Sequence, residues 1–177
     1  VILLAYHERE LAAMMTKNYS NIIDQIFVWT GDVRILLSII KLIEDRKNVE
    51  ADTARVGVRV IIIVEDSVKF FSSYLPLVYR EIMLQTRALM AEGLNISHKI
   101  LRMRARPKIL LAQNYEEAWQ LFEKYQKYLL AIISDFRFKI GGEIDDEAGI
   151  KLIRKIREQQ PDLPIIMQSS GMLNAEL

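Results

Sequence analysis

The sequence predicts an α/β protein built around a parallel β-sheet. Two observations support this prediction. Short apolar runs rich in Ile and Val recur along the chain, and most do not alternate between apolar and polar residues, as expected for strands covered on both faces. Segments with the periodicity of amphipathic helices lie between these runs.

Six apolar runs are interpreted as strands, and they occupy residues 1–6, 25–29, 58–66, 108–113, 129–135 and 164–170. Three segments between them carry apolar residues at helical spacing, namely residues 33–46, 115–128 and 148–159. Strands that alternate with helices in this order favour a parallel sheet with right-handed crossovers.

Two segments interrupt this alternation. Residues 50–57 include Glu, Asp, Thr and Arg and end in Gly, so residues 51–57 are interpreted as a linker between a first piece at residues 1–50 and a domain at residues 58–177. Residues 67–107 are longer than one crossover helix requires. They predict an elongated first helix with Pro76 as a kink, followed by an insertion before the next strand.

The composition excludes several classes of protein. Of the 177 residues, 51% are hydrophobic and 27% are charged, which excludes a disordered chain. A net charge of +1 offers no general attraction to nucleic acid or to a membrane surface, and no apolar run approaches the roughly 20 residues of a membrane span. The chain has no cysteine, which excludes disulfides and thiolate metal sites and fits the cytoplasm. The ends suggest an excerpt of a longer protein.

Polar side chains stand where three of the predicted strands end. Glu65 and Asp66 end one strand, Asp135 ends another, and Ser169 and Ser170 follow the last. Functional groups of an open parallel sheet collect at the carboxyl ends of its strands, so these side chains are expected to converge. Clustered carboxylates suit a hard cation such as Mg²⁺, and a carboxylate can also accept a phosphoryl group.

These motifs, "IIIVEDS", "AIISDFRF" and "LPIIMQSS", resemble the receiver domain of bacterial response regulators in two-component signal transduction. The resemblance covers residues 58–177. It implies a flavodoxin-like, doubly wound parallel sheet with the strand order 2-1-3-4-5. It also implies a phosphoprotein of the phosphorelay type and no enzyme activity in the usual sense.

The resemblance implies a role for each site residue. Asp135 would accept the phosphoryl group from a histidine kinase or a phosphotransfer protein. Asp66 and Asp135 would hold Mg²⁺ directly, Glu65 would hold it through water, and the backbone carbonyl of Arg137 would be a further ligand. Ser169 would bond a phosphate oxygen and switch a surface that an output domain of the same longer protein recognises.

Two features depart from the receiver pattern. The lysine that follows the fifth strand in receivers lies beyond this chain, and Phe138-Lys139 stands where receivers usually carry a pair such as Met-Pro. A sheet without its fifth strand has an open edge. We expect the strand at residues 25–29 to fill that edge, within the chain or by exchange between two chains.

Residues 1–50 resemble the back half of a second receiver, with the order strand, helix, strand, helix. Its switch positions are degenerate, because Leu4 or Ala5 replaces the hydroxyl residue and Trp29-Thr30 replaces the Lys-Pro pair. Together the two pieces resemble the receiver pair found ahead of phosphoenolpyruvate/pyruvate-binding domains in some large bacterial proteins.

Simpler interpretations of the same residues stay open. Asp135 could cap a turn, and the Glu65-Asp66-Ser67 triplet could cap the following helix while also binding a cation. The acidic run at residues 145–147 favours a helix cap over a metal loop. The basic run has Arg102, Arg104, Arg106 and Lys108 at alternate positions, and without aromatic platforms it favours a solvated or protein-facing segment over a nucleic-acid groove.

A second functional hypothesis needs no phosphorylation. The degenerate first piece shows that a receiver-like unit without switch residues occurs in this chain. The chain could therefore act as an interaction module through the long helix at residues 67–92, including as a homodimer. The apolar residues available for such a contact are Phe70, Leu77, Met83, Leu84 and Leu89. A phosphatase of the haloacid-dehalogenase kind is disfavoured, because Phe136-Arg137 replaces the required second Asp.

Overall fold

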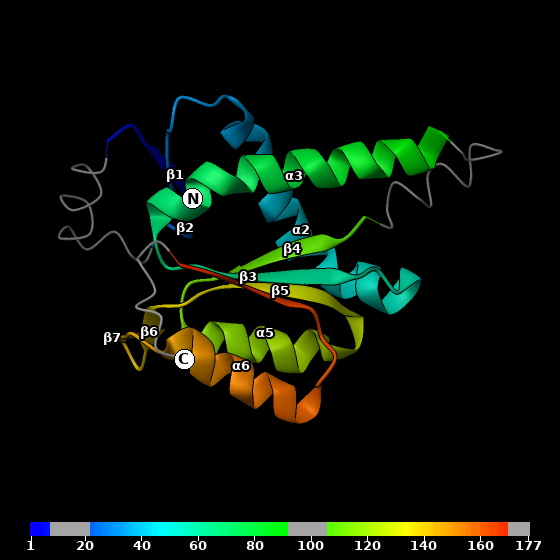
Figure 1. Cartoon of the computed structure of the whole chain (residues 1–177). Coiled ribbons are helices and arrows are strands. Elements are labelled where there is room, and N and C mark those ends of the chain that lie inside the picture. Colours follow the sequence, from blue (N-terminus) through cyan, green and yellow to red (C-terminus); the bar gives the residue numbers. More distant parts are fainter. Residues whose placement is uncertain (8–21, 92–105, 170–177) are drawn as a thin grey trace.

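A four-stranded parallel sheet forms the centre of the molecule, as the sequence predicts (Figure 1). The computed structural model of the chain describes residues 1–7, 22–91 and 106–169. The sheet has the order β4-β3-β5-β8. Its strands are β3 (Val60–Val64), β4 (Lys108–Ala112), β5 (Leu129–Asp135) and β8 (Ile165–Gln168).

The register of these strands aligns their carboxyl ends. Val64 of β3 pairs with Ser134 of β5, and Asp135 pairs with Gln168 of β8. All three strand pairs are parallel. The α/β class with a parallel central sheet is therefore confirmed. The full five-stranded flavodoxin-like order stays a prediction.

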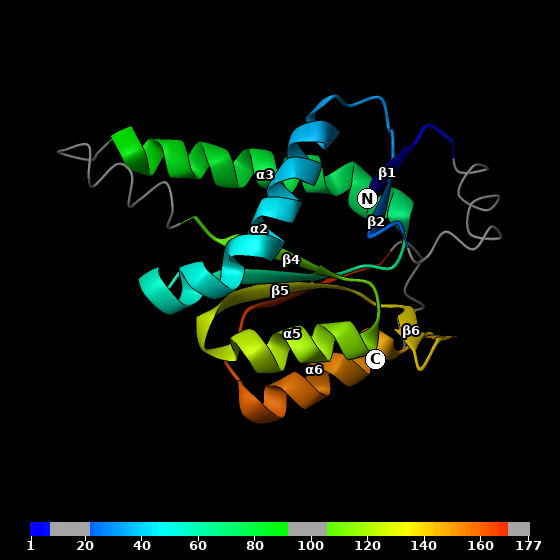
Figure 2. The same ribbon diagram turned by 180° about the vertical axis from the view of Figure 1, so that it is seen from behind.

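Helices cover both faces of the sheet (Figures 1 and 2). One face carries α2 (Arg34–Val56) and α3 (Val68–Ala91), and the other carries α5 (Tyr115–Tyr125), the short 3₁₀ helix η1 (Gln126–Tyr128) and α6 (Ala148–Gln159). Each layer has its own core of buried side chains. Each core contains fully buried aromatic side chains: Phe71 and Tyr79 of α3 in one, and Phe122 of α5 in the other.

The elongated first helix is confirmed. Helix α3 has 24 residues and continues through Pro76, which has no N–H to donate to the preceding turn. Ser67 precedes the helix, and its Oγ accepts a hydrogen bond from the Phe70 N–H at 3.4 Å. Ser67 therefore caps α3 as expected, since a hydroxyl before a helix satisfies one of its free N–H groups.

The first piece of the chain does not complete the central sheet. Strand β2 (Gln25–Val28) pairs in parallel with β1 (Ile2–Ala5) in a separate two-stranded sheet. The expectation that residues 25–29 fill the open edge is therefore wrong within the chain. The helix predicted between β1 and β2 falls largely in residues 8–21, outside the described part.

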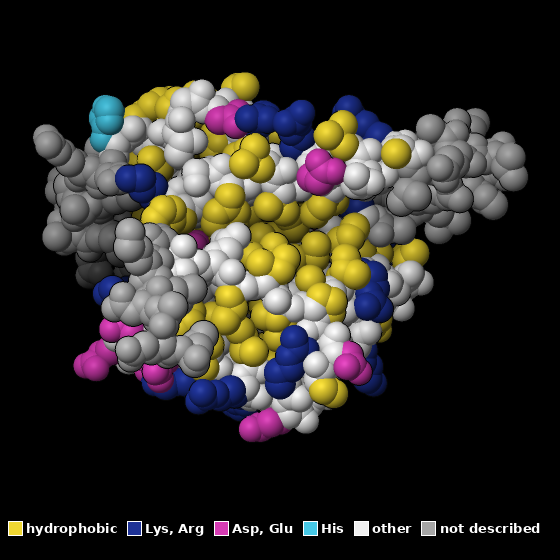
Figure 3. Space-filling view, in the orientation of Figure 1, with side chains coloured by type: hydrophobic (Ala, Val, Ile, Leu, Met, Phe, Trp, Pro, Cys, Tyr) yellow, Lys and Arg dark blue, Asp and Glu magenta, His cyan; other side chains and the backbone are white. Residues whose placement is uncertain are grey.

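Strand β2 instead packs on α3. The Val28 N–H donates to Ser72 Oγ at 3.0 Å, and the Phe27 and Phe71 rings meet edge to face at 5.5 Å. Among the described strands of the central sheet, β8 therefore stays at an edge. A broad hydrophobic surface lies between the α3 layer and the α5–α6 layer in Figure 3, and Ile166 of β8 is 55% exposed.

Residues 51–57 are not a linker. Helix α2 continues to Val56, and only Gly57 leaves it, with a left-handed φ of 68°. Polar composition suggested a linker, but Val49 and Thr53 are buried on the inner side of this helix. The first piece therefore shares a core with the central sheet: Phe27, Ile35, Ile63 and Ile109 belong to one buried cluster.

A buried carboxylate joins α2 to the sheet. Asp45 is 0% exposed, and its Oδ1 lies 2.6 Å from Arg106 Nη2. Its Oδ2 accepts hydrogen bonds from Arg106 Nη1 and the Ile109 N–H, both at 3.0 Å, and from the Tyr79 hydroxyl at 3.1 Å. Lys108 Nζ lies 2.7 Å from Asp52 of the same helix. We call this group the Asp45 network.

The Asp45 network corrects the interpretation of the basic run. Arg106 and Lys108 are buried against α2 and do not form a solvated or partner-facing segment. Alternate spacing alone cannot distinguish a charged surface from a buried ion pair, because the acidic partner lies about 60 positions away. Arg102 and Arg104 lie outside the described residues.

A β-hairpin follows the third strand of the sheet, and the sequence analysis missed it. Strands β6 (Phe138–Ile140) and β7 (Glu143–Asp145) pair antiparallel around Gly141 and Gly142. Both glycines have positive φ, of 60° and 90°, which suits a two-residue hairpin turn. Asp145 then accepts the Glu147 N–H at 2.8 Å. Glu147 occupies the N-cap position of α6 and makes no side-chain cap hydrogen bond, so the expected helix cap is not formed there.

Over the described ranges, no helix is long and apolar enough to cross a membrane.

Replacing Asp45 with Asn should destabilise the protein by about 3 kcal/mol or more, because a buried ion pair that loses one partner leaves an uncompensated charge. The side chain keeps its size, so the loss measures charge and not packing. Urea denaturation followed by circular dichroism checks this prediction.

Glu50→Gln is the matched control. It removes an exposed pair with Lys124 at 2.9 Å between the same helix α2 and helix α5, and it should leave the urea midpoint nearly unchanged. Equal effects of the two substitutions would show that the Asp45 network does not hold α2 in place.

Candidate functional site

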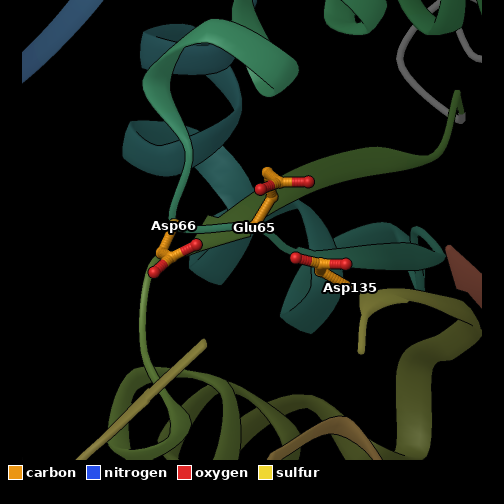
Figure 4. Close-up of side chains that lie close together, drawn as sticks. All are labelled: Glu65, Asp66 and Asp135. Atoms are coloured by element: carbon orange, nitrogen blue, oxygen red, sulfur yellow. The ribbon is translucent and has the colours of Figure 1, made fainter. Parts of the chain in front are cut away.

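Three carboxylates meet at the carboxyl end of the central sheet (Figure 4). Glu65 and Asp66 follow β3, and Asp135 is the last residue of β5. One oxygen of each carboxylate lies within 4.8 Å of the others. The predicted convergence of these three side chains is thereby confirmed. We call the three residues the acidic cluster.

Backbone bonds hold Glu65 and Asp66 at the end of β3. The Glu65 N–H donates to the carbonyl of Ala112 on β4 at 3.0 Å, which prolongs the pairing of β3 by one residue. Glu65 is only 3% exposed, and its Oε1 accepts the Ser67 N–H at 3.0 Å. Asp66 is partly buried between Glu65 and the start of α3. The turn into α3 therefore positions both acids.

Asp135 is held by the loop that follows it. The Phe136 N–H donates to Asp135 Oδ1 at 2.7 Å and to the Gln168 carbonyl at 3.0 Å. The hydroxyl of Ser134 is buried and donates to the Asp135 carbonyl at 2.8 Å. Asp135 thus caps its own turn, as one interpretation expected, and the backbone N–H of Arg137 also interacts with its carboxylate.

Helix α6 packs tightly on this loop. The Gly149 N–H donates to the Phe136 carbonyl at 3.0 Å. A Cβ at Gly149 would lie 2.5 Å from the carbonyl oxygen of Asp135, so no larger residue fits here without a shift. Gly149 is therefore a position where the backbone of α6 must approach the site closely.

Burial makes the acidic cluster costly to charge. Desolvation raises the pKa of Glu65 from 4.5 to about 7. The hydrogen bond from the Ser67 N–H opposes this rise, and the negative charges of Asp135 and Asp66 add to it. Burial also raises the pKa of Asp66, and the negative charge of Asp135 raises it further. Burial likewise raises the pKa of Asp135. A cation placed among these oxygens would favour their charged forms.

Two groups near the acidic cluster were missed by sequence reasoning. Lys139 on β6 lowers the pKa of Asp66 by its charge, which opposes the effect of burial. Tyr74 on α3 has a buried hydroxyl without a hydrogen-bond partner in the described part of the chain. Burial, followed by the charges of Glu65 and Asp135, raises the pKa of Tyr74.

Different signals could have found these two residues. Lys139 was named only as part of the departure at Phe138-Lys139, and its positive charge four residues past Asp135 is the signal that could have found it. Tyr74 lies three residues after Phe71 on the apolar stripe of α3, where a hydroxyl is out of place unless it has a polar neighbour.

The other predicted site residues are Ser169 and Arg137. Ser169 follows Gln168, the strand partner of Asp135, so it stands at the same edge of the sheet. Ser170 lies outside the described residues. Arg137 stands two residues past Asp135, and its backbone hydrogen bond and its charge lower the pKa of Asp135, which opposes the effect of burial. Its guanidinium pairs with Asp146 at 3.0 Å on the surface.

The degenerate switch positions lie in or directly after the first two strands of the chain, which precede the strands that carry the acidic cluster. Leu4 and Ala5 belong to β1, and Trp29 and Thr30 follow β2. The Trp29 ring packs near that of Tyr6, with 6.2 Å between ring centres.

Comparison of the chain with family models, with curated proteins and with solved structures found no match.

The arrangement has a limited set of chemical uses. Carboxylate oxygens from neighbouring strands form a ligand set that hard divalent cations prefer, although acidic clusters also occur without a cation. Asp135 has one carboxylate oxygen that accepts no hydrogen bond from Phe136, and this oxygen could act as a nucleophile.

The stability of the protein in metal-free buffer should fall as the pH rises from about 4.5 through 7, the window set by the ordinary and folded pKa of Glu65. Across this window the folded state keeps the Glu65 proton while the unfolded chain loses it. The contribution of Glu65 to the free energy of unfolding is therefore largest below pH 4.5 and is lost as the pH rises through 7. Thermal unfolding between pH 4 and 8 measures this trend.

Glu65→Gln should make that pH dependence shallower, because the substituted side chain cannot ionise. Glu123→Gln, on the exposed side of α5, is the control and should leave the trend of the wild type intact. A slope unaffected by Glu65→Gln would contradict the raised pKa.

Gly149→Ala should destabilise the protein by about 1–3 kcal/mol, the usual cost of overpacking, since the new methyl group collides with the backbone at Asp135. It should also shift the NMR resonance of the Phe136 amide. Arg154→Ala, an exposed change on the same helix, should move neither quantity. An unchanged Phe136 resonance in Gly149→Ala would exclude the tight packing of α6 on this loop.

Proposed function

We propose that this chain is a receiver-type module that accepts a phosphoryl group on Asp135. The observation that carries the proposal is the meeting of Glu65, Asp66 and Asp135, from neighbouring strand ends, within 4.8 Å. The order of the motifs along the chain supports the same proposal. It also supports a flavodoxin-like fold with the order 2-1-3-4-5 in the longer protein.

Mg²⁺ is the proposed cofactor. Asp66 and Asp135 would hold it directly, with Glu65 and the backbone carbonyl of Arg137 completing the set. The oxygen-only donor set and the raised pKa values of the three carboxylates fit such an ion. When bound, Mg²⁺ would neutralise the charge that gathers around a transferring phosphoryl group.

The proposed reaction moves one phosphoryl group between two proteins. A carboxylate oxygen of Asp135 forms a bond to phosphorus while the bond between phosphorus and the imidazole nitrogen of a partner's phosphohistidine breaks. The imidazole leaves with the electron pair of that bond. The hydrogen bond from the Phe136 N–H holds the carboxylate in one orientation, which positions the nucleophile.

The proposed partners follow from this reaction. A histidine kinase or a phosphotransfer protein of a bacterial, cytoplasmic phosphorelay would supply the phosphoryl group. Ser169, at the same edge of the sheet as Asp135, would bond the phosphate and bias a surface for an output domain. Lys139 supplies a positive charge near Asp66.

Incubation with acetyl phosphate and Mg²⁺, followed by intact mass measurement, tests the proposal. The wild type should gain one phosphate that is lost at alkaline pH, as an acyl phosphate is. Asp135→Asn should gain none, because the amide is not a nucleophile of this kind. Asp66→Asn should gain far less, because it lacks a proposed metal ligand.

Asp162→Asn is the matched control for this experiment. Asp162 is exposed in the turn after α6, so its substitution should leave the labelling intact. A phosphate gain by Asp135→Asn equal to that of the wild type would refute the assignment of the phosphoacceptor.

An interaction module that works without phosphorylation is the second candidate. Helix α3 favours it through exposed apolar side chains: Phe70 is 41% exposed, Leu77 52% and Leu84 44%. Such a module would bind its partner, or a second copy of itself, equally well with Asp135→Asn but poorly with Leu84→Glu.

A further inference from the structure

A groove runs between α2 and α3 on the side away from the central sheet. It encloses about 170 Å³. Its lining includes Arg34 and Leu37 from α2 and Pro76, Arg80, Leu84 and Arg87 from α3. We call this feature the α2–α3 groove.

Helical spacing explains why these side chains share one groove. Pro76, Arg80, Leu84 and Arg87 are separated by four, four and three residues, so they form one stripe along α3. Arg34 and Leu37 are three residues apart and form the facing stripe on α2. The Tyr79 side chain closes the bottom, where it bonds to Asp45.

The walls of the groove expose apolar side chains to solvent. Leu37 is 43% exposed and Leu84 is 44% exposed. Leu77 on α3 and Ile40 on α2 extend the apolar surface, with exposures of 52% and 59%. Figure 3 shows hydrophobic, basic and acidic side chains on the surface over α3. Contiguous exposed apolar surface of this kind marks an interaction site.

The charges of the groove are positive. Arg34 is paired with Asp32 at 2.6 Å. In the described residues, Arg80 and Arg87 have no carboxylate within ion-pair distance, and no acidic side chain lines the groove. Two arginines beside an apolar wall are therefore available for an acidic partner.

We propose that the α2–α3 groove docks an acidic amphipathic α-helix of a partner protein. Such a helix would place its apolar stripe against Leu37 and Leu84. Its flanking Asp or Glu residues would pair with Arg80 and Arg87, which are seven residues or about 10 Å apart along α3. Carboxylates at positions i and i+7 of the partner helix match that distance.

Other partners fit the groove less well. Nucleic acid is recognised through aromatic stacking platforms and dense basic surfaces, and this groove has apolar aliphatic walls. The proposal is independent of phosphorylation at Asp135, because no residue of the acidic cluster lines the groove. It gives the module a partner surface in either functional state.

A designed peptide provides the probe. It has about 18 residues, or five helical turns, with Leu at i, i+4 and i+7 and Glu on both sides of that stripe. Binding of the fluorescein-labelled peptide to the full chain is followed by anisotropy. We expect saturable binding that weakens as salt is raised. The same peptide with Lys in place of each Glu should bind at least tenfold more weakly.

Substitutions in the protein locate the binding. The double variant Arg80→Glu/Arg87→Glu should bind the Glu peptide at least tenfold more weakly, and Leu84→Glu should also lose binding. Arg154→Glu on the opposite layer is the matched charge control and should bind as the wild type does. Circular dichroism and thermal unfolding confirm that each variant is folded.

Three results with the peptides would overturn the proposal. They are a Glu peptide that does not saturate the wild type, a Lys peptide that binds equally well, and a folded double variant that binds like Arg154→Glu. Self-association of the wild type that the double variant abolishes would also overturn it, because the groove would then hold a second copy of this chain.

Discussion

The Asp45 network is the constraint on which the arrangement of the helices depends. A carboxylate with no exposed surface must be fully paired, and Asp45 finds its partners on three different elements: α3, β4 and the residues just before β4. These bonds bring α2 against α3 and the edge strand. The shared core and the α2–α3 groove both result from that contact.

Helix α3 connects the two regions to which we assign functions. It starts two residues after Asp66, and its first turns carry Tyr74 toward the acidic cluster. Its later turns carry Arg80, Leu84 and Arg87 along the groove. One helix therefore borders both the acidic cluster and the α2–α3 groove, and Phe71, Leu75 and Tyr79 fix it to the core between them.

The chemistry of the acidic cluster follows from burial and proximity together. Separate surface carboxylates would ionise readily, but these three are partly or fully desolvated and close to one another, so charging all of them is unfavourable. The tight approach of α6 at Gly149 keeps the Asp135 loop in place. Three carboxylates that are unfavourable to ionise together would be stabilised in their charged forms by a bound cation. Phosphoryl transfer to Asp135 would require such a cation.

The sequence by itself determined the local structure and the edge at which the acids meet. Apolar runs identified the strands of the central sheet, and helical spacing found α5 and α6. The length of the segment after residue 66 indicated the extended α3, and parallel strand ends placed Glu65, Asp66 and Asp135 together. Only the tertiary structure decided contacts between distant segments. The partner of Arg106 and Lys108, the continuation of α2 through residues 51–56 and the separate pairing of β2 depend on burial against residues far away in the chain. Local composition indicates whether a segment favours a helix, a strand or a turn. It does not show which distant segment will pack against that segment and exclude water from it.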